Sequence, residues 1–196
     1  MRKNKEILNL LNLATKKEKQ SKKYVDWNWI IKILFVAFII SFSFSFISEL
    51  TIPNVNIIIG IILVIAFIVI GVIFDMIGVA VTSSDEKIFH SMSSRKVKGA
   101  RLAVKFKKSA DKVSSFCNDV IGDVCGIISG SAGVIIASSL ATKFNLNSFF
   151  TSLIITALIA ALTIGGKAIG KSYAINKSNV ILYRFTKFLS NFIKEK

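Results

Sequence analysis

The sequence has few of the residues from which most catalytic and metal centres are built. Its 196 residues include one histidine, one proline, two cysteines and only 11 acidic residues. Cys117 and Cys125 lie eight positions apart, about 12 Å along a helix axis, so they cannot form a disulfide within one helix. His90 has no second histidine, and the sequence has no CxxC pair, phosphate-binding loop or nucleophile–base arrangement. We therefore expect a protein that is not an enzyme, with cysteines that serve packing.

The shortage of acids leaves a formal net charge of +15, because the chain has 26 lysine and arginine residues. In a soluble protein this charge would suggest a nucleic-acid partner. Here 53% of the residues are hydrophobic, and they occur in long blocks that basic residues flank. That arrangement is typical of charge at a membrane surface. We therefore expect a lipid bilayer with anionic headgroups as the partner, and no nucleic acid.

Four apolar blocks are long enough to cross about 30 Å of hydrocarbon. They cover residues 29–47, 57–81, 118–141 and 149–170. The first block follows a polar leader and lacks a small-residue cleavage site, so we interpret it as a membrane span rather than a secretory signal. The predicted fold class is an all-α membrane protein with four transmembrane helices.

The charge of the connecting segments predicts how these spans are oriented. The leader has eight basic residues, the 82–116 connection has nine, and the tail is basic from Lys167 onward. The 48–56 connection has no basic residue, and the 142–148 connection has only Lys143. This alternation predicts that both termini and the middle connection are cytoplasmic. We expect a multi-pass protein of the plasma (inner) membrane of a bacterium.

Two of the cytoplasmic segments show a basic face and an apolar face at helical spacing. In the middle connection the basic residues are Arg101, Lys105, Lys108 and Lys112, and the apolar ones are Ala103, Phe106, Ala110 and Val113. In the tail the corresponding sets are Arg184, Lys187 and Lys194, and Ile181, Phe185, Phe188 and Phe192. Amphipathic basic helices bind the membrane surface, so we expect both segments to lie on anionic lipid.

Three acidic residues lie in or at the edge of the apolar blocks: Asp75, Asp119 and Asp123. A charged side chain at the bilayer centre costs about 2.5–3.5 kcal/mol on insertion scales, so it usually has an ion, a proton or a partner. At 1.5 Å per residue, Asp75 lies about 9 Å inside the second span. Asp119 and Asp123 share one face at the start of the third span. Lys167 in the fourth span falls at the same level.

Neutral oxygens accompany these acids at the same level, from Ser114, Ser115 and Asn118. Oxygen donors without cysteine or histidine suit a hard cation such as Mg²⁺ or Ca²⁺. The pattern therefore predicts a cation site built from the three acids and these three residues. A second interpretation stays open, in which Lys167 pairs with one acid and forms a neutral structural plug, or in which some of the acids are interfacial and solvated or cap the start of the third helix.

Glycines recur along the third span, at Gly122, Gly126, Gly130 and Gly133. Small residues at this spacing allow helix backbones to approach closely in lipid. The stripe includes Asp119 and Asp123, so we expect the acidic pair to face a helix contact.

Four stretches carry a resemblance to a known family. RKVKGARLAVKF at 95–106, followed by ADKVSS at 110–115, is similar to a basic helical connection, and VAVTS at 79–83 to the end of the span before it. GKAIGKSYA at 166–174 is similar to a GEIIPK-type motif. In these features, residues 60–175 resemble the transmembrane domain of the cyclin M and CorB/CorC family of magnesium transporters.

The resemblance implies three core spans, Mg²⁺ as the ion and a homodimer. It divides the chain into a basic cytoplasmic leader (1–28), an additional transmembrane helix with an external loop (29–56), a transporter-like domain (57–175) with a helical connection (82–116), and an amphipathic tail (176–196). The chain departs from the family motif at Lys167, which replaces its Glu, and at Gly170, which replaces its Pro. Asp75 lies three residues before the position of the family's acid, Gly78. Asn118, Asp119 or Asp123 could each correspond to the family's Asn.

Two functions are compatible with these patterns. The first is a divalent-cation transporter or binder, with Lys167 as a gating or charge-balancing group and with Gly165, Gly166 and Gly170 softening the fourth helix. The second is a non-transporting membrane scaffold or regulator in which pairs between Lys167 and the acids lock the helices. Small size and basic ends also allow a holin-like pore.

Overall fold

The computed structural model describes residues 27–52 and 55–192. The chain forms two units, Met1–Leu34 and Phe35–Lys196, of which the first contributes only the opening turns of one helix to the described part. Every element in the described ranges is helical: α2 (Trp27–Thr51), α3 (Ile57–Ser83), α4 (Glu86–Ser94), α5 (Ala100–Lys108), α6 (Ala110–Ser115), the π-helix η2 (Phe116–Gly122), α7 (Asp123–Phe144), α8 (Ser148–Asn176) and α9 (Ser178–Leu189). The predicted all-helical class is confirmed.

Four helical stretches are long and apolar enough to cross a membrane, which confirms the four predicted blocks. They are α2, α3, α8 and the continuous run Ala110–Phe144, which joins α6, η2 and α7. The third stretch starts eight residues before the predicted 118, because helical turns continue back through η2 and α6. Its start is set at Ser109, whose φ of −116° and ψ of 36° interrupt the helix.

Side-chain caps mark where the long helices begin. The Asn56 side chain accepts a hydrogen bond from Ile58 N at 3.2 Å and starts α3. The Asn147 side chain accepts one from Phe149 N at 3.0 Å and starts α8. Both caps satisfy backbone donors that have no partner inside the helix. Asn145 adopts a left-handed conformation (φ 50°) and ends α7.

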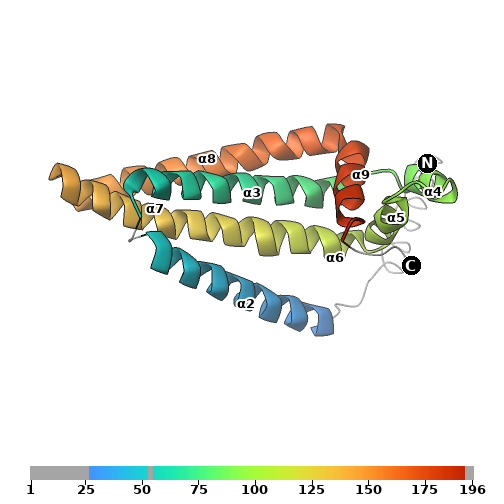
Figure 1. The fold of residues 1–196 in the computed structure, drawn as a ribbon, viewed down its shortest axis with the longest axis horizontal. Helices are drawn as coiled ribbons and strands as arrows, with labels where there is room; N and C mark the ends of the chain where they lie inside the picture. The colour runs from blue at the N-terminus through green and yellow to red at the C-terminus, as the bar shows by residue number, and fades with distance from the viewer. Residues whose placement is uncertain (1–26, 53–54, 193–196) are drawn as a thin grey trace, which may run out of the picture. The chain divides into compact units, whose positions relative to one another are not determined.

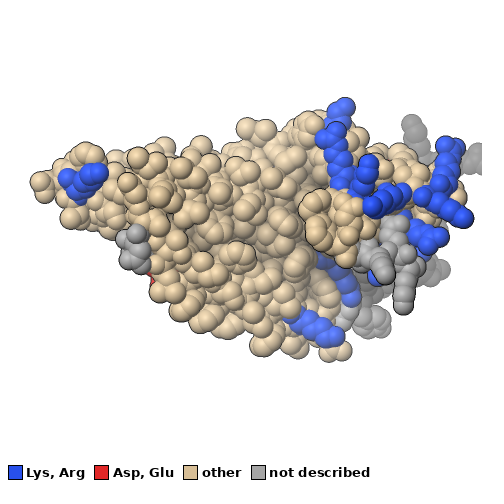
Figure 2. Space-filling view, in the orientation of Figure 1, with Lys and Arg blue, Asp and Glu red and all other residues tan. Residues whose placement is uncertain are grey.

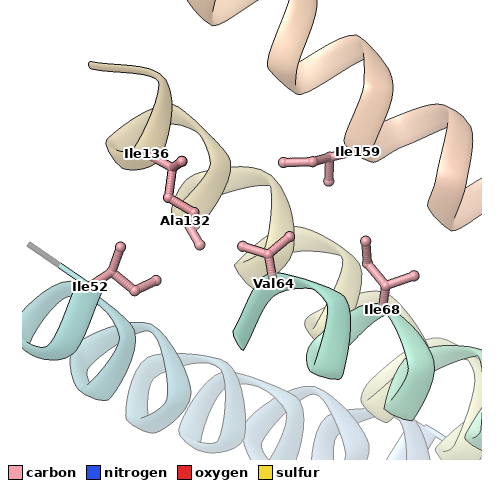
Figure 3. Close-up of a cluster of buried hydrophobic side chains, with 6 residues drawn as sticks. All are labelled: Ile52, Val64, Ile68, Ala132, Ile136 and Ile159. Carbon is pink, nitrogen blue, oxygen red and sulfur yellow. The ribbon is translucent and has the colours of Figure 1, made fainter. Parts of the chain in front are cut away.

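Helices α3, α7 and α8 pack against one another along their lengths (Figure 1). A cluster of buried aliphatic side chains fills the space between them in the half distant from α9 (Figure 3): Ile52, Val64, Ile68, Ala132, Ile136 and Ile159. A Cβ atom added at Gly133 would overlap Ile159 Cδ1, so α7 and α8 approach closely here only because residue 133 has no side chain.

The end at which α3 and α8 finish carries α4, α5 and α9, and we call it the basic end. Figure 2 shows lysine and arginine side chains gathered over these helices. Beneath them lies a second core of buried side chains: Ile77, Val81, Phe89, Ala103, Cys117 and Leu182. Helix α9 crosses the end of α3 (Figure 1).

The apolar faces predicted to lie on lipid are largely covered by this second core. Ala103 is buried in it, and Phe106 and Phe185 pack against it. The structure therefore gives the apolar face of α5 a protein partner. Among the described residues of the tail's apolar face, those at its end remain exposed, since Phe188 and Phe192 are 61% and 75% exposed.

The helices of the basic end hold the last turn of α3. Lys107 Nζ, from α5, donates hydrogen bonds to the backbone oxygens of Val81 at 3.0 Å and Thr82 at 2.6 Å. Such a lysine satisfies carbonyls that a helix leaves without partners at its C-terminus. Gly99 starts α5 with φ 86°, and a Cβ there would lie 2.8 Å from the backbone of Lys187 in α9. The Lys107 side chain thus ties α5 to the end of α3, and the close backbone approach at Gly99 ties α5 to α9.

Candidate functional site

Asp75 is the one predicted acid that the structure buries in the bundle. Its side chain is 3% exposed, and its Oδ2 lies 3.4 Å from Lys171 Nζ in α8. No residue in the described part donates a hydrogen bond to this Oδ2. The side chain of Lys171 is 49% exposed. The pair is therefore an ion pair with a buried carboxylate and a lysine that stays at the surface.

Glycines on both sides of Asp75 bring three helices close together. A Cβ added at Gly71 in α3 would lie 3.1 Å from Cys125 Cβ in α7 and 3.3 Å from the backbone oxygen of Gly122, the last residue of η2. A Cβ at Gly170 in α8 would lie 2.9 Å from Met76 Cγ in α3. These approaches place the backbones of α7 and α8 around Asp75.

Helix α8 runs without a break from Ser148 to Asn176. It thus continues as a regular helix through Gly165, Gly166 and Gly170, which were predicted to soften it. A Cβ at Gly166 would lie 3.1 Å from Val72 Cγ2, so Gly166, like Gly170, serves a close contact with α3.

A second buried oxygen lies on the same face of α3. Asn118 Oδ1 is buried and receives no hydrogen bond from the described residues. A Cβ at Gly78 would overlap this oxygen, and Gly78 lies three positions after Asp75, on the same helix face. Asn118 Nδ2 donates to Ser114 Oγ at 3.3 Å. The structure thus brings Asp75, Asn118 and Ser114 to one region.

Asn118 reaches this position from the π-helical segment η2. A π-helical turn has one more residue than an α-helical turn, and such turns are frequent at functional sites. Successive residues of a helix point in different directions, so Asn118 is half-buried whereas Asp119, the next residue, is exposed.

Asp123 has a different lysine partner. Its Oδ1 accepts a hydrogen bond from Lys167 Nζ at 2.8 Å. Here the exposures are reversed, since the Asp123 side chain is 62% exposed and that of Lys167 is 18% exposed. Lys167 thus pairs with an acid, as the neutral-plug interpretation requires, but the acid lies on the surface.

The Asp123–Lys167 pair closes one end of an open groove between α7 and α8. The groove has a volume of about 460 Å³ and is also lined by Gly126, Gly130 and Thr163. A Cβ at Gly130 would meet no atom within 4 Å, and one at Gly126 would meet only Thr163 Cγ2, at 3.8 Å. These two glycines were predicted to serve helix packing, yet within the described part of the chain they face the groove.

The three predicted acids do not form one cluster. Among residues 27–52 and 55–192, no group of three or more acidic, histidine or cysteine side chains could hold a metal ion. Asp119 is exposed, Asp123 pairs with Lys167, and Ser115 is half-buried in α6. A cation at Asp75 would therefore have one carboxylate and neutral oxygens as protein ligands.

Lys171 is the residue that sequence reasoning missed, because Lys167 matched the depth of Asp75 better by residue count. Side chains on a helix point towards its N-terminus, so a lysine reaches back over the preceding turn. The Lys171 side chain therefore reaches Asp75, although the Cα of Lys171 lies one turn nearer the basic end than that of Lys167. The direction in which helical side chains point could have identified Lys171 as the partner of Asp75.

Comparisons with known proteins add no assignment to this geometry. No protein-family model, no curated protein and no solved structure matches the chain. The resemblance to magnesium transporters thus stays a prediction, and the site rests on its own contacts.

Proposed function

We propose that this chain is an integral membrane protein that binds and transports a hard divalent cation, with Mg²⁺ as the first candidate. The site consists of Asp75 with Asn118 and Ser114 as neutral oxygen donors. The observation that carries the proposal is the pair of buried oxygens, Asp75 Oδ2 and Asn118 Oδ1, to which no described residue donates a hydrogen bond.

Burying two acceptor oxygens of this kind costs free energy unless a hydrogen-bond donor or a cation interacts with them. A buried acceptor without a donor costs about 1–3 kcal/mol, and more when it is charged. Unsatisfied groups in a native structure therefore call for an explanation such as a bound water or ion. Mg²⁺ is commonly held through one or two carboxylates while it keeps several waters, so a single aspartate with two neutral donors suits a hydrated Mg²⁺.

The proposed orientation places the basic end in the cytoplasm, following the loop-charge pattern. The exposed cations of this end include Arg101, Lys105 and Lys108. They would face anionic headgroups of the inner leaflet, with Phe188 and Phe192 as the apolar contact. The site at Asp75 then opens towards the cytoplasmic side through Lys171.

A homodimer is part of this proposal, with the groove between α7 and α8 as its interface. Gly126 and Gly130 form a GxxxG pair with open space in front of it, and such pairs drive helix association in lipid. Asp123 and Lys167 at the end of the groove carry opposite charges, so two copies related by a twofold axis can pair them crosswise.

A non-transporting scaffold is the second candidate, and the two lysine–aspartate pairs favour it. Each pair joins α8 to a different helix, α3 through Asp75 and α7 through Asp123. Pairing makes both sites neutral, as a structural lock between membrane helices requires.

Calorimetric titration of the purified chain with Mg²⁺, Ca²⁺ and Mn²⁺ tests the binding site. We expect Asp75→Asn to abolish binding and Asp119→Asn to leave it unchanged, because Asp75 is buried in the bundle whereas Asp119 is exposed. Equal loss in the two variants, or no binding by the wild type, would contradict the proposed site.

Mg²⁺ flux into proteoliposomes separates transport from the scaffold. Wild-type chain should move Mg²⁺ and Asp75→Asn should not, while both keep the same melting temperature in detergent. Binding without flux would favour the scaffold.

A further inference from the structure

The two lysine–aspartate pairs differ in a way that indicates different roles. Lys167 donates a hydrogen bond to Asp123 at 2.8 Å, and the lysine is the more buried partner. Lys171 lies 3.4 Å from Asp75 without a hydrogen bond to its Oδ2, and the lysine is the more exposed partner. A structural lock would combine good hydrogen-bond geometry with a held lysine. The Lys171–Asp75 pair has neither property.

Lys171 can leave Asp75 without rearranging the helices. Its four-carbon stem is flexible, and half of its side chain already reaches the surface at the basic end. Asp75 has no such freedom, because the close contacts at Gly71 and Gly170 hold the helices around it. The ammonium group is thus the mobile member of the pair.

We propose that Lys171 is a tethered cation that occupies the Asp75 site in the absence of metal and is displaced when a divalent cation enters. This inference rests on the proposed function, because it assigns the regulation of the same site. The site then exchanges one positive charge for another, and the carboxylate is never left without a counter-charge.

Electrostatics requires the displacement. A divalent cation bound at Asp75 with Lys171 in place would set three positive charges against one carboxylate. Repulsion between an ammonium and a cation a few ångströms apart in a partly dry site is strong. Lys171 therefore competes with the metal and lowers its apparent affinity.

The first test uses the wild-type chain and reads the position of the ammonium group directly. The purified protein is acetylated with an N-hydroxysuccinimide ester, with and without Mg²⁺, and the rate at each lysine is measured by mass spectrometry. We expect Mg²⁺ to raise the rate at Lys171 several-fold and to leave Lys177, an exposed lysine at the end of α8, unchanged. In Asp75→Asn the rate at Lys171 should be high at the start and insensitive to Mg²⁺.

The second test measures affinity. Lys171→Gln removes the competing charge, so Mg²⁺ should bind at least about tenfold more tightly. Lys177→Gln removes a charge at the C-terminal cap of α8, away from Asp75, and the Mg²⁺ affinity of this variant should equal that of the wild type.

The outcomes separate this inference from the proposed function. If Mg²⁺ binds in an Asp75-dependent way, but Lys171 reactivity does not change and Lys171→Gln binds no more tightly, the tethered-cation inference is overturned and the proposed function stands. If neither the wild type nor Lys171→Gln binds Mg²⁺, both are overturned. Binding by Lys171→Gln alone supports the inference in its strongest form.

Discussion

Helix α8 places two lysines one turn apart, and each meets an aspartate of a different helix. Lys167 is mostly buried and holds an exposed acid of α7, whereas Lys171 is half exposed and reaches a buried acid of α3. The same two residue types thus form a surface pair and a buried one. An exposed acid can be solvated when its lysine is removed, whereas a buried acid cannot, so the free energy of each pair depends on where the carboxylate lies.

The largest effect should come from breaking the buried pair. Lys171→Met leaves Asp75 without a counter-charge. We expect the free energy of unfolding to fall by about 3 kcal/mol. This value is at the lower end of the range for breaking a buried ion pair, because the Lys171 side chain is half exposed. Chemical denaturation in detergent measures it. The double variant Asp75→Asn with Lys171→Met should recover most of the loss. A single variant as stable as the wild type would show that Asp75 is solvated.

A smaller loss should follow from crowding the second buried oxygen. Gly78→Ala places a Cβ on Asn118 Oδ1, and overpacking of this kind costs about 1–3 kcal/mol. Because Asn118 must move, the Mg²⁺ affinity should fall as well. Gly165→Ala is the matched control, since a Cβ at Gly165 meets no atom within 4 Å. Equal stabilities for the two alanine variants would argue against the packing of Asn118 on α3.

The surface pair should contribute least to stability. In a double-mutant cycle with Lys167→Met and Asp123→Asn, we expect a coupling of about 0.2–1 kcal/mol, because the carboxylate is exposed. Thermal unfolding of the four proteins gives the value. Coupling as large as that of the Lys171–Asp75 pair would remove the distinction between the two pairs.

The four long helices could be predicted because hydrocarbon thickness sets one simple requirement, a sufficient length of apolar residues. Which side chains contact one another inside the bundle could not be predicted, because these contacts depend on how each helix is rotated about its axis. Residue spacing does not say which face of the third span turns inward, and in the structure Asn118 is half-buried against α3 whereas Asp119 and Asp123 are exposed. Amphipathic spacing likewise identified the apolar face of α5 but not whether lipid or α3 and α9 covers it.

The groove beside the surface pair allows a last and finer test, which concerns assembly rather than stability. Gly130→Leu would fill open space in a single copy, so the monomer should tolerate it, but it would block the close approach of a second α7. We expect the dimer fraction, measured by cross-linking in membranes, to fall sharply. Gly133→Leu is an unsuitable control because it would overlap Ile159, so Val134→Leu, at an exposed position of α7 that does not line the groove, serves instead. An unchanged dimer fraction would exclude this groove as the interface and leave the exposed Asp123 to be stabilised by Lys167 and water at the membrane surface.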